Sequence, residues 1–530
     1  MKSGLASLSV AALLAVAAPS AEAETVEHMY SPQTVDVIEL TLPPASKAAL
    51  EEDPEGDYVE GTFALAETDG SPDGVGPAST PLTVGIRLKG DGSFQGLDGK
   101  AAFKLKFNEF VKKQAFLGLK KMTLNNMAQD PSMIHEALAY EVFRAAGIVA
   151  PRTGFASVRV NGEDYGIHLN LEAMDVVALE RHHGGFEDPQ HLYEGNYLAD
   201  ALQPSLGKFE VDEGDDEDLS DLEALAAAVE AEDPGPFLER MAPVADLDQM
   251  TRMWAVENYL AHWDGYAGLG GPNNFYLHSR PDGVFEMLPW GTDQTWEEPQ
   301  LGFGHRGGVL FKRCLADQAC LELYLAALKG VEATVAGLGL DGRATAMAEL
   351  LRPWQQLEAE PRKLYGDEEI AAEVEATRAF ISGRPASLAE WLEDGPQPEP
   401  EPEPEPAPLP DPALPRDPVV GPLPRFTGPI EIDRSRISRG VMISRVDVPA
   451  AGGVTQVASR VGKKEGAIAC SARQVATGAG EVTIRCRLSG AVRRRIAAGR
   501  LRLSVSTRFD AGKGTPETLT RIVILARETG

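Results

Sequence analysis

Two aspartates and a pair of asparagines carry the clearest chemistry in this sequence. Asp264 follows a run with helical spacing, Asn273 and Asn274 stand in a glycine-rich loop, and Asp293 follows a short strand-like run. Phosphoryl transfer needs such groups: one carboxylate orients or deprotonates the acceptor hydroxyl, while an amide and a second carboxylate hold Mg²⁺ on the phosphates. In glycine-rich loops, Asp and Asn also commonly serve only as turn formers. A tryptophan beside each aspartate favours fixed, partly buried carboxylates.

An ordered series of motifs surrounds these residues. The motifs are Ile86-Arg-Leu-Lys-Gly-Asp-Gly-Ser93, Lys104-Leu-Lys-Phe107, Leu124-Asn-Asn126, Asp130-Pro-Ser132, Val160-Asn-Gly162, Tyr165-Gly166, Leu171-Glu172, Trp263-Asp264, Asn273-Asn274 and Pro289-Trp290. Each motif alone is weak, whereas their order along the chain is specific. Through this order, residues 35–325 resemble the CotH kinase-like family.

The resemblance implies an atypical protein-kinase fold of two lobes that transfers phosphate from ATP to Ser or Thr of secreted or coat proteins, or of itself. Asp264 would then be the catalytic aspartate. Asn273 or Asn274 would bind Mg²⁺, and Asp293 would be the second metal carboxylate.

The same resemblance assigns the nucleotide contacts. Lys104 or Lys106 would pair with the phosphates, since residues i and i+2 of a strand share one face. The partner acid on the following helix would be Glu136 or Glu141, which the sequence does not separate.

Two further segments complete the expected nucleotide site. The stretch ending at Glu172 would form the hinge against adenine, and the turn from Gly90 to Ser93 would cover the phosphates. We expect Glu172, Gly90 and Ser93 to line the cofactor site.

The chain departs from the family pattern at two positions. Gly291 stands where the family commonly has the first acid after Pro-Trp, so only Asp293 remains, and Lys89 replaces the usual second arginine of the glycine turn. These departures keep a second function open, namely a catalytically weak or inactive surface structural or adhesion protein built on a kinase-like scaffold.

The N-terminus predicts export. Residues 1–23 combine a basic start, an apolar run from Leu8 to Ala18 and the small triplet Ala21-Glu22-Ala23, which is typical of a cleavable signal peptide. No other run approaches membrane-spanning length. We therefore expect a secreted or extracytoplasmic protein without a transmembrane segment.

A proline- and glutamate-rich stretch, 396–415, divides the rest of the chain. Alternating prolines exclude helix and sheet, so this segment is expected to be an extended linker between a 24–395 domain and a 416–530 domain. From residue 416 onward 21 Lys and Arg oppose 9 Asp and Glu, a net charge of +12, although the whole chain carries −30. The basic tail, densest at 493–495, would suit an anionic cell-envelope polymer, and the acidic body excludes nucleic acid as a partner.

Hydrophobic periodicity supplies the elements that must position these groups. Strand patterns dominate before residue 175, including a hairpin around Asn161-Gly162, and helical patterns follow, so the first domain is predicted to be α+β. Alternating short runs in 416–530 predict a small, all-β, immunoglobulin-like sandwich. Cys314 with Cys320, and Cys470 with Cys486, are candidate disulfides. His182, His183 and His191 lack ligand spacing and are expected at the surface.

Overall fold

A computed structural model describes residues 26–394, apart from 55, 91–92, 184–189, 232–234, 270, 298–301 and 305–306. In the C-terminal part it describes residues 430–433, 441–449, 452–460, 468–476, 479–487, 500–510 and 517–526. The chain divides into two compact units, Met1–Gln397 and Pro398–Gly530. The expected signal peptide 1–23, the linker 396–415 and the arginines at 493–495 lie outside the described residues.

The first seven strands close into a barrel in the order β1-β2-β3-β4-β5-β7-β6. They are β1 (Val35–Thr41), β2 (Val59–Ala66), β3 (Leu82–Lys89), β4 (Ala102–Lys106), β5 (Lys121–Asn125), β6 (Thr153–Val160) and β7 (Glu163–Leu171). The barrel closes because β6 pairs in parallel with β1. Side chains alternate between faces, so Ile86 and Leu88 join the buried inner cluster while Arg87 and Lys89 project from the outer face.

The β6–β7 hairpin turns at Asn161 and Gly162, whose φ angles of 53° and 79° belong to the left-handed region. Asparagine and glycine tolerate these angles, which match the twist of the paired strands. The hairpin prediction is therefore confirmed.

A second, antiparallel sheet has the order β11-β10-β8-β9. Its strands are β8 (His191–Gly195), β9 (Phe209–Glu213), β10 (Phe275–Ser279) and β11 (Phe285–Pro289). His191 is buried here and lies 3.0 Å from the Asp221 carboxylate, and most of the His183 side chain is buried as well. The expectation that these two histidines lie at the surface is wrong, because their strand and helix pack inward; His182 is exposed, as expected.

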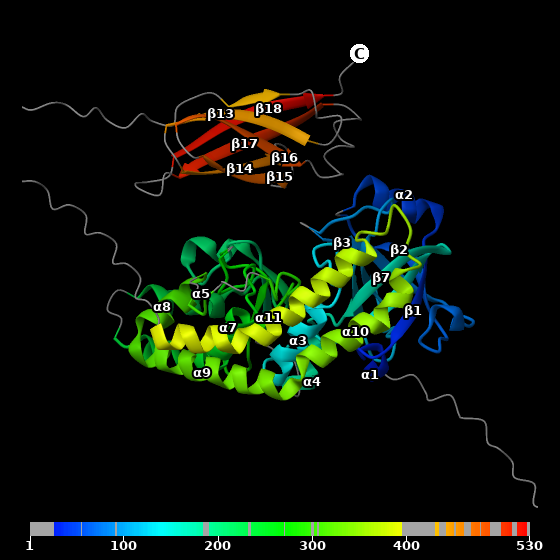
Figure 1. The fold of residues 1–530 in the computed structure, drawn as a ribbon, viewed down its shortest axis with the longest axis horizontal. Coiled ribbons are helices and arrows are strands. Elements are labelled where there is room, and N and C mark those ends of the chain that lie inside the picture. The colour runs from blue at the N-terminus through cyan, green and yellow to red at the C-terminus, as the bar shows by residue number, and fades with distance from the viewer. Residues whose placement is uncertain are drawn as a thin grey trace, which may run out of the picture. The chain divides into compact units, whose positions relative to one another are not determined.

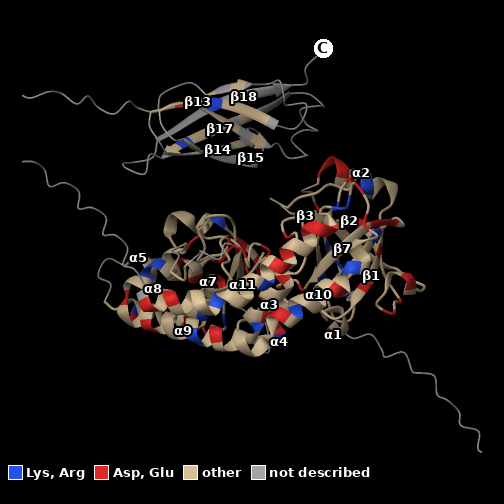
Figure 2. Cartoon of the chain, viewed as in Figure 1, with Lys and Arg blue, Asp and Glu red and all other residues tan. Residues whose placement is uncertain are grey.

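Helices make up most of the remaining first unit, which is α+β as predicted (Figure 1). They are α1 (Val26–Met29), α2 (Pro44–Glu52), α3 (His135–Ala145), α4 (Val176–His183), α5 (Ser220–Glu230), α6 (Phe237–Met241), α7 (Leu247–Tyr259), α8 (Val309–Ala316), α9 (Gln318–Leu338), α10 (Leu340–Gln355) and α11 (Asp367–Asp394), with short 3-10 turns at Pro72–Gly74 and Gln203–Lys208. Acidic and basic residues are interspersed along α9 to α11 (Figure 2). The helix α3 contacts both the barrel strand β6 and the helices α7, α9 and α10.

The last two helices brace the unit. α10 contacts α3 and the barrel strand β7, and α11 packs along α10 (Figure 1). From α11, Thr377 lies 2.7 Å from His135 of α3, and Arg384 donates to the backbone carbonyls of Asn258 and Tyr259 at the end of α7. The C-terminal carbonyls of α7 thus receive a buried cation, which stabilises a helix end.

A buried ion pair attaches the segment after α10 to the barrel. Lys100 Nζ lies 2.8 Å from Glu358 Oε1, and both side chains are buried. The same oxygen accepts the backbone N–H of Ile167 in β7 at 2.7 Å. Burial lowers the pKa of Lys100, and the attraction of Glu358 opposes that shift.

The C-terminal unit is built from strands in its described residues. One sheet has the order β12-β13-β16 and the other the order β15-β14-β17-β18. The strands are β12 (Glu431–Asp433), β13 (Val441–Val448), β14 (Gly452–Arg460), β15 (Ile468–Ala476), β16 (Gly480–Arg487), β17 (Arg500–Asp510) and β18 (Glu517–Ala526). Met442 and Ile484 from the first sheet share a buried cluster with Val454 and Val505 from the second.

The cysteine predictions have two outcomes. Cys314 and Cys320 form a disulfide, as predicted from their spacing. Cys486 is also disulfide-bonded, while the side chain of its expected partner, Cys470, lies outside the described residues.

No single helix of the described ranges has the length and apolar character to cross a membrane. One bent pair, Gln318–Leu338 with Leu340–Gln355, passes the same test by length and composition alone.

Lys100→Met should destabilise the chain by about 3 kcal/mol or more, because it leaves the Glu358 carboxylate buried without its counter-charge. Denaturant unfolding measures the change. Adding Glu358→Gln to this variant should recover part of the loss. Lys363→Met, which breaks a more exposed ion pair with Asp367, should cost less than about 1 kcal/mol. Equal losses at Lys100 and Lys363 would contradict the role of the buried pair.

Candidate active site

The loop that carries Asp264 is held by a carboxylate of the preceding helix. Glu257, in the last turns of α7, accepts the backbone N–H groups of Tyr266 at 3.0 Å and Ala267 at 2.9 Å. Burial raises the pKa of Glu257 to about 8, although both hydrogen bonds lower it. The contact folds the loop back on the helix that precedes it.

The Asp264 carboxylate lies between the two asparagines that the sequence indicated. Asn273 Nδ2 donates to one carboxylate oxygen at 3.1 Å, and Asn274 Nδ2 donates to the other at 3.0 Å. Burial raises the pKa of Asp264, and these two amides oppose the shift. Both hydrogen bonds use amide nitrogens, so the amide oxygens, the atoms that a hard cation prefers, are not consumed by Asp264.

Gly291 touches this group from the loop after β11. Its φ is 50°, and a Cβ atom there would lie 2.6 Å from Asn274 Oδ1. Its carbonyl oxygen lies 3.2 Å from His262 Nε2. The position where the family commonly has an acid is therefore packed against the Asn274 side chain, which explains why glycine fits here.

A second polar cluster lies around Glu136 of α3. Its Oε2 accepts Asn125 Nδ2 at 2.6 Å, while its Oε1 is buried without a hydrogen-bond partner. Glu141, the other candidate acid, points elsewhere and pairs with Arg343 at 3.2 Å. The structure thus separates two carboxylates that the sequence left equivalent.

Asp293 and Lys89 share the surroundings of Glu136. Burial, and next the Asp293 carboxylate, raise the pKa of Glu136 to about 7, and Lys89 opposes this rise. Burial raises the pKa of Asp293 to about 6, with Lys89 again opposing. A carboxylate that disfavours the ionisation of its neighbour creates a place for further positive charge. Carboxylate and amide oxygens suit Mg²⁺, and the unpartnered Glu136 oxygen fits this reading.

Neither β4 lysine forms an ion pair with α3 in the described part of the chain, so the expected Lys104 or Lys106 pair with a helix carboxylate is wrong. Lys106 Nζ pairs with Glu109 at 2.6 Å. Strand register explains this result, because Lys89 faces Ala102 on β4 and so lies nearer Glu136 along the outer face. Lys104 and Lys106 are two and four residues farther along β4.

Lys104 instead lines a cavity of about 60 Å³ between the barrel and the second sheet. Arg87 is its cross-strand neighbour on β3, and Tyr276 and Trp290 line the cavity from the other sheet. Burial lowers the pKa of Lys104, while the Glu194 carboxylate opposes the shift. The cavity therefore combines cationic and aromatic walls.

The remaining cofactor candidates border this region. Glu172 is bound by Arg152 and Arg181, whose hydrogen bonds lower its pKa against the effect of burial, and its neighbours Ala173 and Met174 line the cavity. Its side chain is thus engaged in an ion-pair group beside the cavity.

The glycine turn is attached to the barrel through Ser93, at the end of the turn. Gly90 has a φ of 114°, and the backbone carbonyl of Ser93 accepts Asn126 Nδ2 at 3.2 Å. Asn126 also donates to the carbonyl of Lys100 at 2.8 Å. Residues 91 and 92, between them, lie outside the described residues.

Sequence reasoning missed Lys89, Asn125 and Glu257 as parts of the site. Lys89 and Arg87 are two residues apart on β3, so the strand pattern places both side chains on one face. Asn125 stands inside the Leu124-Asn-Asn126 motif. Glu257 gave no signal, since an acid in a helix is usually solvated.

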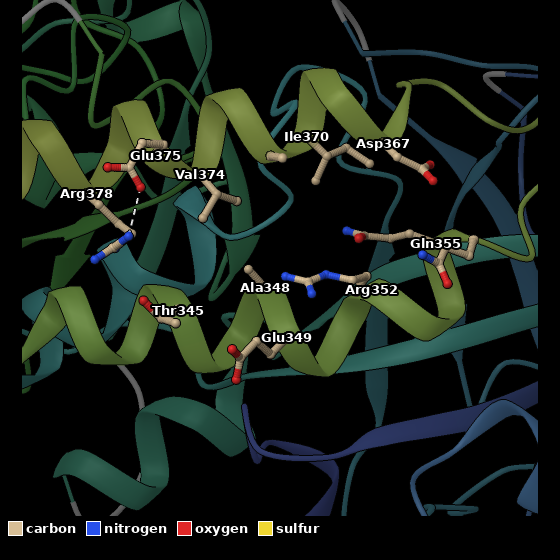
Figure 3. Close-up of a pocket in the computed structure, with 12 residues that line it drawn as sticks. Thr345, Ala348, Glu349, Arg352, Gln355, Asp367, Ile370, Val374, Glu375 and Arg378 are labelled. Carbon is tan, nitrogen blue, oxygen red and sulfur yellow. Dashed lines mark hydrogen bonds and ion pairs between the residues drawn. The ribbon is translucent and has the colours of Figure 1, made fainter.

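A wider groove of about 260 Å³ lies between α10 and α11. Figure 3 shows Arg378 and Glu375 paired along α11 at its rim, with Ile370 and Val374 on its wall. Asp367 and Arg378 of its lining also form surface ion pairs, with Lys363 and Asp341. The described lining of the groove has no counterpart of the aspartate with two asparagines, so the candidate active site remains the region of Asp264 and Asp293.

Comparison with known proteins agrees with the motif order. Residues 86–388, more than half of the chain, match the family model described as CotH kinase protein. The inner spore coat protein H of Bacillus subtilis (strain 168) is 26% identical over 196 residues, which cover 35% of this chain and 53% of that protein. The matched stretch thus spans about half the length of this relative. The family match begins later than the expected residue 35 and extends past residue 325 into α11.

Glu136→Gln should flatten the pH dependence of stability. A carboxylate whose pKa is raised on folding binds more protons in the folded state, so the unfolding free energy falls as pH rises from about 4.5 to about 7. The wild-type chain should lose stability across this range, and the variant should lose less. Urea unfolding at several pH values measures this, with Glu109→Gln at an exposed position as control. Parallel curves for wild type and Glu136→Gln would refute the assignment.

Gly291→Ala should destabilise the chain by about 1 kcal/mol more than Gly283→Ala. Both glycines have positive φ, but a Cβ at Gly283 meets no atom within 4 Å, whereas one at Gly291 meets Asn274. Gly283→Ala therefore measures backbone strain alone, about 1 kcal/mol. Denaturant midpoints compare the two variants. Equal losses of stability would contradict the prediction, because they would mean that the Asn274 side chain moves aside at no cost.

Proposed function

Because the chain belongs to the CotH kinase protein family, we propose that it transfers the γ-phosphate of ATP to Ser or Thr hydroxyls of extracytoplasmic or coat proteins, or of itself. The observation that carries this proposal is that Asn274, which donates to Asp264, lies against Gly291, two residues before Asp293 in the chain, and that Asp293 in turn acts on the Glu136 carboxylate. Phosphoryl transfer is chiefly a matter of positioning and charge, and these groups supply both.

In the proposed reaction Asp264 holds the acceptor hydroxyl and takes its proton. The acceptor oxygen forms a bond to the γ-phosphorus as the bond to the β–γ bridging oxygen breaks, and ADP leaves. Asn273, Asn274 and Asp293 would hold Mg²⁺, which supplies charge neutralisation at the phosphates. Lys89 offsets the negative charge of Glu136 and Asp293, and Lys104 with Arg87 offers positive charge at the cavity.

The second candidate, a kinase-like scaffold with a structural role at a cell or spore surface, also has specific support. The cavity beside Lys104 is about 60 Å³, whereas pockets that enclose small ligands hold about 300 Å³ or more. A nucleotide would therefore require side chains such as Trp290 to move. The relative named as an inner spore coat protein fits either candidate.

Asp264→Asn should reduce phosphate transfer by more than about 100-fold, because the side chain keeps its shape and loses the proton acceptor. Incubation of the full chain with labelled ATP and Mg²⁺ measures incorporation into itself and into added protein. Lys106→Met, at a lysine already paired with Glu109, should retain activity.

Circular dichroism of each variant establishes that folding is retained. Unchanged incorporation by Asp264→Asn would contradict its assignment. If the folded wild-type chain neither binds ATP nor incorporates phosphate, the scaffold function replaces the kinase function.

A further inference from the structure

We propose that His183, His278 and Glu286 form a binding site for Zn²⁺, separate from the candidate active site. His278 and Glu286 face each other across β10 and β11 as cross-strand partners. His183 reaches them from the end of α4. Asn274, by contrast, precedes the opposite end of β10, so the two sites lie at opposite ends of one strand.

Three ligand atoms converge at this position. Glu286 Oε1 lies 2.7 Å from His278 Nδ1 and 2.8 Å from His183 Nε2, and all three atoms lie within 4.8 Å of one another. Ligands of a tetrahedral zinc ion, with bonds of about 2.0–2.1 Å, lie about 3.3 Å apart. Small side-chain rotations would bring the three atoms to that separation.

Burial makes the cluster unlike a solvated charge pair. His278 is fully buried and Glu286 nearly so. His183 Nε2 is a buried nitrogen without a hydrogen bond of normal geometry, even though it lies close to Glu286. A metal ion bound at this nitrogen would satisfy it.

The second ring nitrogen of His278 faces the side-chain oxygen of Gln190. Its Nε2 lies 3.2 Å from Gln190 Oε1, just before β8. Histidine ligands of metals commonly donate their second ring N–H to an oxygen acceptor, which fixes the ring and exposes the remaining nitrogen. Nδ1 of His278 would then be the ligand atom, and it is the atom that faces Glu286.

The donor set selects the class of metal. Two imidazoles and one carboxylate suit Zn²⁺ and related transition metals, whereas Mg²⁺ and Ca²⁺ prefer oxygen ligands alone. Three protein ligands leave one coordination position for water. Such an ion would fasten α4, which follows the segment beside the Lys104 cavity, to the second sheet. The competing arrangement is a proton shared between the histidines and Glu286.

The test uses the full chain, stripped of metal by a chelator and supplied with excess Mg²⁺ to occupy carboxylate sites. Calorimetric titration with Zn²⁺ should show one tight site per chain, and Co²⁺ in its place should give the absorption of a tetrahedral ion. His183→Ala and Glu286→Gln should weaken Zn²⁺ binding by more than about 100-fold, since loss of outer-shell partners alone costs 10–100-fold.

His182→Ala is the matched control, because it removes the exposed neighbouring histidine of the same helix. It should bind Zn²⁺ like the wild type, as should Asp293→Asn in the candidate active site. The proposal is overturned if the wild-type chain binds no Zn²⁺ in excess Mg²⁺, or if His183→Ala and His182→Ala bind it equally. Absence of the tetrahedral Co²⁺ spectrum in the wild type would also overturn it.

Discussion

A single buried carboxylate sets the position of the candidate active site. Glu257 accepts two backbone N–H groups from the loop that follows its own helix, so the chain returns on itself at Asp264. Asp264 then accepts a hydrogen bond from the Asn274 amide, and the Asn274 side chain packs against Gly291. Because each contact fixes the next, the geometry of the loop depends on a carboxyl group that is buried away from solvent.

A lysine of the barrel, Lys89, lies near the carboxylates of the candidate active site. On the outer barrel face, Lys89, Lys104 and Lys106 take part in successive cross-strand rows of β3 and β4. The row that contains Lys89 is nearest α3, so Lys89 moderates the repulsion between Glu136 and Asp293. Position along the strands, rather than the number of lysines, decides which one acts there.

Features that depend on neighbouring residues could be predicted from the sequence. The turn at Asn161-Gly162, the Cys314–Cys320 disulfide and the placement of Asp264 with the two asparagines all follow from short-range chemistry. The resemblance in motif order also identified the family.

Features that depend on distant pairing could not be predicted. Closure of the barrel requires β6 to pair with β1, more than a hundred residues earlier in the chain, and no local pattern encodes a parallel pairing of this kind. The choice between Glu136 and Glu141 depends on how α3 is rotated against the barrel strand β6 and the helices α7, α9 and α10. The convergence of His183 with His278 depends on the packing of α4, which helical periodicity alone does not place.

The pairing of Lys100 with Glu358 has a consequence for the order of folding. The two residues are 258 positions apart, yet the ammonium lies at the barrel and needs its partner from the segment after α10. A chain that emerges from its N-terminus first must hold the barrel unfinished, or Lys100 hydrated, until nearly the whole unit is available. Closure of so long a loop is slow, which keeps the first unit open until the segment after α10 has reached the barrel.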